Sequence, residues 1–165
     1  MRTGWLAAAA ALISVSAMAP LINSQEAMAM ESSQQKIVKL PKPEYDSQTA
    51  IEQALRERRS HRSFARAPLS LTEISQLCWA AQGITSRRGF RTAPSAGALY
   101  PLELFVAAAA IDGLDPGLYR YLPGDHRLVK EAAGDKTDAL WKAALHQSAI
   151  KAAPAVFVFT AVFER

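Results

Sequence analysis

Apolar residues recur at helical spacing in two stretches of the first half of the chain. Thr49–Glu52 and Ser70–Glu73 each have the spacing of a capping box, so each predicts the start of a helix. The second helix should run through Ala81, with Gly83 at the position where a glycine often ends a helix. The residues expected on the buried face of the first helix are Ile51, Ala54 and Leu55.

The second half of the chain predicts mostly strands. Four segments have the alternation or the β-branched and aromatic content of a strand: Leu102–Ala110, Leu118–Leu122, Arg127–Glu131 and Ala155–Phe163. The last of them is a continuous β-branched and aromatic run, which suits a central strand buried on both faces. A third helix should follow Asp135 and continue to about Ile150. This mixture of helices and strands predicts an α+β fold.

The amino-terminal segment has the organisation of a secretory signal peptide, which we expect to cover residues 1–29. Arg2 supplies the positive charge, Leu6–Val15 the apolar stretch, and Ala27-Met28-Ala29 the cleavage site. An uncleaved membrane anchor is the alternative, but Pro20 interrupts the apolar run before the about 20 residues that a spanning helix needs. We therefore expect an exported protein, periplasmic or secreted, with no stable membrane span after cleavage. Residues 30–46 should form an extended lead-in to a domain over residues 47–165.

The composition fits a folded domain and makes nucleic-acid and metal binding weak candidates. Half of the 165 residues are hydrophobic, and the formal net charge is +4. The arginines form compact groups and not a long basic stripe with interleaved aromatic residues, so we expect no nucleic-acid partner. The three histidines and the single Cys78 lack the spacing of metal ligands. Cys78 lies in an apolar helical pattern, where it should pack as a small hydrophobe.

A cluster of basic residues follows the first predicted helix. Arg58, Arg59, Ser60 and Arg62 offer guanidinium forks and a hydroxyl donor within five positions. A dianionic phosphate favours such a set of donors. The same run is also typical of a helix C-terminus, where cations complement the helix dipole and stay solvated. This stretch alone leaves both interpretations open.

The segment from Arg91 to Pro101 is rich in small residues and contains Pro94 and Pro101. Small side chains with free backbone amides allow a chain to lie against a flat ring system and to offer donors to its polar atoms. A tight turn before the strand at Leu102 would use the same residues, so this segment also has two interpretations.

Taken in order, these segments resemble the nitroreductase superfamily. The run Arg-Arg-Ser-x-Arg-Ser-Phe is followed by Pro-Leu-Ser-Leu-x-Glu-Ile and then by Thr-Ala-Pro-Ser-Ala-Gly-Ala-Leu-Tyr-Pro-Leu-Glu. The pattern is most similar to that of the SagB-type dehydrogenases, the branch that includes azoline oxidases, and it extends from about Ile51 to Arg165. The resemblance implies a three-layer α+β sandwich with a mainly antiparallel sheet, which binds FMN at the interface of an intertwined homodimer.

The resemblance also implies a role for each segment. The FMN phosphate would be held by Arg58, Arg59, Ser60 and Arg62, and the flavin ring would lie along Pro94, Ser95, Ala96, Gly97 and Leu99. Ala98 stands where many relatives carry an asparagine, although alanine is also found in the SagB-type branch. The reaction would be hydride transfer through the flavin N5 to or from a small electron-poor substrate, with NAD(P)H as a candidate donor. No catalytic acid or base is assigned, and for Tyr100 we favour a packing role over a catalytic one.

The carboxyl end departs from the family pattern. The chain ends at Arg165, directly after the apolar strand, whereas family members continue with further helices and a dimer-embracing tail. We therefore expect a domain that is incomplete at its carboxyl end. A non-catalytic flavin-binding remnant is the alternative to a working FMN-dependent oxidoreductase.

Overall fold

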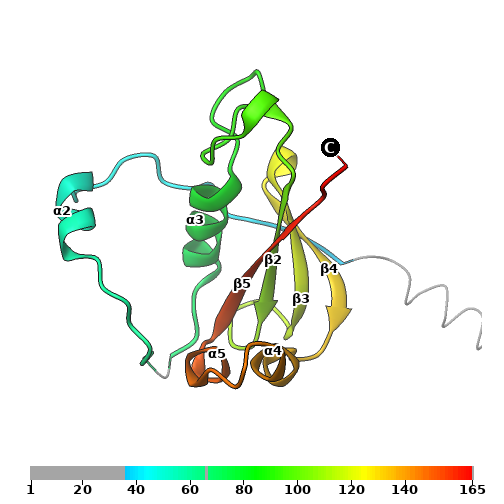
Figure 1. The fold of residues 1–165 in the computed structure, drawn as a ribbon. Helices are drawn as coiled ribbons and strands as arrows, with labels where there is room; N and C mark the ends of the chain where they lie inside the picture. Colours follow the sequence, from blue (N-terminus) through cyan, green and yellow to red (C-terminus); the bar gives the residue numbers. More distant parts are fainter. Residues whose placement is uncertain (1–35, 66, 165) are drawn as a thin grey trace, which may run out of the picture. The chain divides into compact units, whose positions relative to one another are not determined.

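The computed structural model describes residues 36–65 and 67–164, so the expected signal segment lies outside the described part of the chain. Five strands form one sheet in the order β1-β4-β3-β2-β5, and every neighbouring pair is antiparallel (Figure 1). The strands are β1 (Ile37–Lys39), β2 (Leu102–Ala108), β3 (Gly117–Leu122), β4 (Arg127–Ala133) and β5 (Ala155–Ala161). The predicted α+β class with an antiparallel sheet is confirmed.

Helix α3 (Leu71–Gln82) supplies the main helical contribution to the core. Its buried residues recur every three to four positions, and Ile74 and Cys78 pack with Leu104 of β2 and Tyr119 of β3. Cys78 is fully buried, and burial raises the pKa of its thiol to about 12. The expectation that this cysteine packs as a hydrophobe is therefore confirmed.

The start of α3 is fixed by the predicted capping box. The Ser70 hydroxyl accepts a hydrogen bond from the Glu73 backbone N–H at 3.2 Å, and the Glu73 carboxylate accepts one from the Ser70 N–H at 2.7 Å. The helix ends at Gly83, as predicted, but this glycine has φ −65° and is not left-handed. A Cβ atom at Gly83 would lie 2.1 Å from Cδ1 of Trp79, so the position requires glycine for space and not for handedness.

The first predicted helix is shorter and more exposed than expected. Helix α2 (Ile51–Glu57) begins after Ala50, without a side-chain cap. The predicted capping box of Thr49 does not form, because the Thr49 backbone N–H bonds to the Ser47 hydroxyl in a local turn. The expected buried face is also wrong, since no residue of α2 is buried and Leu55 is 69% exposed.

None of the helices in the described part of the chain combines the length and the apolar character that a membrane span requires.

The third predicted helix is divided into two short ones. Helix α4 (Thr137–Ala143) and helix α5 (Ser148–Ala152) flank a turn in which Leu145 and His146 are left-handed, with φ 54° and 59°. The rings of His146 and Trp141 are nearly perpendicular, with centres 4.4 Å apart, and the His146 backbone N–H donates to the Trp141 carbonyl. These contacts close the end of α4, so the single helix predicted from Asp135 to Ile150 is wrong.

The last strand occupies a different position from the predicted one. Among the strands that the structure describes, β5 pairs with β2 alone and forms an edge of the sheet. None of its residues is fully buried, and Phe159 is 50% exposed. The prediction of a central strand buried on both faces is therefore wrong, because an apolar run does not specify where a strand lies in the sheet order.

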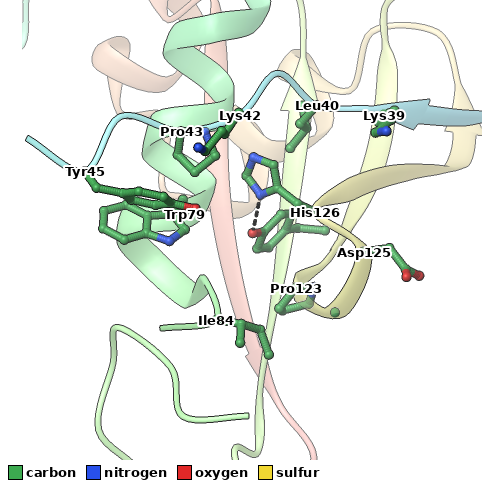
Figure 2. A pocket seen from close by; sticks show the side chains of 12 residues that line it. Lys39, Leu40, Lys42, Pro43, Tyr45, Trp79, Ile84, Pro123, Asp125 and His126 are labelled. Carbon is green, nitrogen blue, oxygen red and sulfur yellow. Dashed lines mark hydrogen bonds between the residues drawn. The ribbon is translucent and has the colours of Figure 1, made fainter. Parts of the chain in front are cut away.

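A partly buried hydrogen-bond cluster joins three distant segments around His126, at the turn between β3 and β4. The Pro41 carbonyl can only accept, and it lies 3.0 Å from His126 Nε2 and 2.6 Å from the Ser75 hydroxyl. His126 Nε2 therefore carries a proton. Because the Ser75 hydroxyl donates its own hydrogen to Pro41, its oxygen accepts from the same Nε2–H, at 2.7 Å. The neutral ring then leaves Nδ1 to accept from the Tyr121 hydroxyl at 2.8 Å (Figure 2).

This cluster predicts that stability depends on the protonation of His126. Burial lowers the pKa of His126 from 6.5, so the folded protein binds this proton less readily than the unfolded chain does. The stability that the neutral ring contributes is present above pH 6.5 and is lost as the pH falls through the folded-state pKa. Urea unfolding at a series of pH values should show this loss. The variant His126→Asn tolerates the left-handed backbone and lacks the imidazole, so its free energy of unfolding should depend less on pH. If the free energy of unfolding changes with pH equally in the variant and in the unmodified chain, the role of His126 is contradicted.

Candidate functional site

The basic segment predicted to hold a phosphate follows α2 in an exposed stretch of chain. Arg58 is the residue at which α2 ends, and Arg58, Arg59, Ser60 and Arg62 are all exposed. Arg59 Nη1 donates to the carbonyls of Arg56 and Arg58, at 2.9 and 2.8 Å. Arg59 thus caps the carboxyl end of the helix, which agrees with the helix-terminus interpretation of this residue.

The other members of the segment keep their donors available. Among the ion pairs and hydrogen bonds of the described residues, none occupies the guanidinium of Arg58 or Arg62. Two unpaired guanidinium groups and the Ser60 hydroxyl within five positions form a donor set that suits a phosphate.

The second predicted segment forms a tight, well-bonded loop around Ser95. The Ser95 carbonyl accepts from the Ala98 N–H at 3.1 Å, and its hydroxyl accepts from the Tyr100 N–H at 2.9 Å. A single 3-10 turn covers Ala96–Ala98, and Gly97, Ala98 and Tyr100 have φ of 63°, 53° and 46°. Three residues in left-handed or nearly left-handed geometry turn the chain sharply, and the small side chains of Ala96 and Gly97 remain exposed.

Arg91 anchors this loop to the last turn of α3. Its Nη1 donates to Oε1 of Gln82 at 3.1 Å, and its guanidinium lies 4.7 Å from the centre of the Tyr100 ring. The Arg91 backbone N–H donates to the Tyr100 hydroxyl at 3.3 Å. Tyr100 therefore has structural contacts within the loop, which supports the packing role that we favoured.

A cavity of about 200 Å³ lies between this loop, α3 and the start of β2. Of the residues predicted to contact a flavin ring, Pro94, Ser95 and Ala96 line it, whereas Gly97 and Leu99 do not. This volume is below the about 300–1,000 Å³ typical of sites for drug-sized ligands. The cavity alone would therefore hold only part of a large planar cofactor.

The structure forms the two predicted segments separately. No hydrogen bond or ion pair of the described residues joins Arg58, Arg59, Ser60 or Arg62 to residues 94–99. The sequence reasoning missed Gln82, which is almost fully buried and holds Arg91 in place. A glutamine at the end of an amphipathic helix gives no signal for such a contact. The described residues also contain no group of three or more histidine, cysteine, aspartate or glutamate side chains that could hold a metal ion.

Comparison with known protein families identifies the fold that carries these segments. The sequence model of the nitroreductase family matches residues 55–165, which is about two thirds of the chain and includes both segments. The chain belongs to the nitroreductase family.

Individual nitroreductase relatives agree with this assignment. A "putative nitroreductase" of Methanocaldococcus jannaschii is 42% identical over 115 residues, which cover 70% of this chain and 58% of that protein. The crystal structure of a "putative nitroreductase" from Ralstonia eutropha JMP134 matches with a TM-score of 0.62 and 31% identity, over 77% of this chain and 56% of that one. One from Anabaena variabilis ATCC 29413 matches with the same TM-score over 77% and 27%; at 22% identity it shows the fold alone. The chain thus spans little more than half the length of its curated relative.

Proposed function

We propose that this nitroreductase-family chain forms part of an FMN-dependent oxidoreductase of the SagB-type branch. The observation that carries the proposal is the family match over residues 55–165, because that range contains the basic segment and the small-residue loop. The proposed reaction transfers hydride between FMN and a small electron-poor substrate, with NAD(P)H as the candidate electron donor. FMN, when bound, supplies this chemistry through its N5 atom, and the protein supplies binding and orientation.

The basic segment fits the phosphate end of FMN. Arg58 and Arg62 would pair with the phosphate oxygens through their guanidinium forks, and the Ser60 hydroxyl would donate a further hydrogen bond. Arg59 would bind in a different way, because its Nη1 already holds two backbone carbonyls. We propose that Arg59 fixes the backbone of the segment and adds its positive charge to the site.

The small-residue loop fits the ring of FMN. Pro94, Ser95, Ala96, Gly97 and Leu99 would lie along the flavin. The bonds of Ser95 and the contact of Arg91 with Tyr100 hold the loop in one conformation, so its backbone is ready to receive a flat ligand. Exposed small residues allow such a ring to approach the backbone closely.

A homodimer is the assembly that we propose for the complete site. Large apolar side chains are exposed on α2 and β5, including Ile51 and Phe159 at 69% and 50% exposure. A second chain that covered these side chains would remove their apolar area from water. A partner subunit would add contacts that the exposed phosphate segment lacks in a single chain.

Export remains a proposal, and its support is the organisation of residues 1–29. If the signal peptide is cleaved after Ala29, the mature protein begins at Met30. Intact-mass measurement of protein from the extracytoplasmic fraction should give the mass of residues 30–165. Recovery of the full chain from Met1 in the cytoplasm would contradict export.

Substitution of the phosphate-binding arginines tests the proposed cofactor. A hydrogen bond to a charged group contributes about 1.5–3 kcal/mol, so Arg58→Ala or Arg62→Ala should weaken FMN binding about tenfold or more. Arg87→Ala is the matched control, because Arg87 is an equally exposed arginine in the turn at residues 86–89. Quenching of FMN fluorescence during titration with each protein gives the affinities.

The same titration includes the results that would contradict the proposal. Unchanged FMN affinity in both Arg58→Ala and Arg62→Ala, or equal loss in Arg87→Ala and Arg58→Ala, would remove the specific phosphate site. If FMN binds but no generic acceptor is reduced in the presence of NADH or NADPH, the non-catalytic flavin-binding alternative is correct.

A further inference from the structure

A second cavity is lined by residues that the proposed flavin site does not use. It occupies about 330 Å³ between the strap (residues 37–45), the last turn of α3 and the turn between β3 and β4 (Figure 2). It shares no lining residue with the cavity beside the small-residue loop. Its volume falls within the about 300–1,000 Å³ typical of small-molecule sites.

One side of this cavity is aromatic. The rings of Tyr45 from the strap and Trp79 from α3 lie 5.1 Å apart at an angle of 56°, and both line the space. Trp79 is held against the backbone at Gly83, which leaves no room for a Cβ atom there. The apolar residues that complete the lining are Leu40, Pro43, Ile84 and Pro123. These walls suit a flat, apolar ring.

The indole nitrogen of Trp79 is an unsatisfied donor at this site. Nε1 is buried and has no hydrogen-bond partner among the described residues. In Figure 2 it lies on the edge of the indole ring that faces Ile84 and His126 across the cavity. Because an indole N–H can only donate, the partner that it lacks is an acceptor.

The charged residues around the cavity favour an anion. Lys39 and Lys42 line it, both are exposed, and neither forms an ion pair within the described part of the chain. Asp125 is the one acidic residue in the lining, and its carboxylate pairs with Arg127 at 2.8 Å. His126 is neutral in the cluster, because Nε2 donates to Pro41 and Nδ1 accepts from Tyr121. It therefore adds no charge to the cavity. The uncompensated charge is therefore positive.

We propose that this cavity binds a small planar aromatic carboxylate. The ring occupies the space beside Tyr45 and Trp79, and a carboxylate oxygen accepts from the indole N–H. Lys42, whose Nζ lies 5.6 Å from the centre of the Tyr45 ring, supplies positive charge to the same lining. His126 and Tyr121 form a fixed wall, because each is already bonded within the cluster. The proposal does not depend on the FMN site, since no residue is shared between the two.

Calorimetric titration of the full chain with 2-naphthoate tests the proposal. Trp79→Phe keeps an aromatic ring but removes the N–H, and should weaken binding about threefold to tenfold. Lys42→Met keeps the apolar stem but removes the charge, and should weaken it about twofold to fivefold. Lys142→Met is the matched control, because Lys142 is an exposed lysine of α4 outside the lining. The uncharged 2-naphthamide should bind more weakly than the acid to the unmodified chain.

Several results would overturn the proposal. Absence of binding at millimolar 2-naphthoate would show that no aromatic acid enters the cavity. Equal binding of the amide and the acid, or an unchanged affinity in Lys42→Met, would remove the anion preference. Competition between 2-naphthoate and FMN would assign the ligand to the flavin site instead. Thermal melting of each variant identifies a loss that comes from unfolding, and the comparison of acid with amide needs no variant at all.

Discussion

The hydrogen bonds of His126 are the interaction on which the arrangement of the described chain depends. One imidazole contacts the carbonyl of Pro41, the hydroxyl of Ser75 and the hydroxyl of Tyr121. These groups come from the strap, from α3 and from β3, so the ring fixes a loop, a helix and a sheet relative to one another. Ser75 and Tyr121 are almost fully buried, and an unpaired polar group there would cost about 1–3 kcal/mol. The cluster therefore requires the neutral tautomer that satisfies all of its members.

The carboxyl end of α3 connects this cluster with both candidate sites. Trp79 places its ring in the aromatic cavity, and its carbonyl accepts from the hydroxyl of Thr92 at 3.1 Å. Gln82, one turn further, binds Arg91 and thereby holds the small-residue loop. The backbone of Thr92 also donates to the carbonyl of Gly83 at 2.9 Å. A helix end that is fixed on one side by the core can thus position residues for two separate ligands.

Signals that act within a few residues were predictable from the sequence. The capping box of Ser70 and Glu73 and the end of α3 at Gly83 depend on neighbouring residues, so their patterns sufficed. The box at Thr49 failed because a competing local hydrogen bond to Ser47 is equally short in range. The prediction that β5 is a central strand failed for another reason, because an apolar run does not specify the order of the strands in a sheet.

The candidate sites show the same division. The basic segment and the small-residue loop are continuous in sequence and were found by their motifs. The aromatic cavity brings together Tyr45, Trp79 and His126, which are far apart in the chain and match no motif. Only the tertiary structure could bring the unpaired indole N–H and two lysines without ion pairs into the lining of one cavity.

Long-range ¹H–¹⁵N NMR of the imidazole of His126 tests the central claim most directly. The account predicts a neutral ring protonated at Nε2, with the nitrogen shift of an acceptor at Nδ1, and a pKa below the 6.5 of a free histidine. A ring protonated at Nδ1, or one that titrates at or above the pKa of a free histidine, would contradict it.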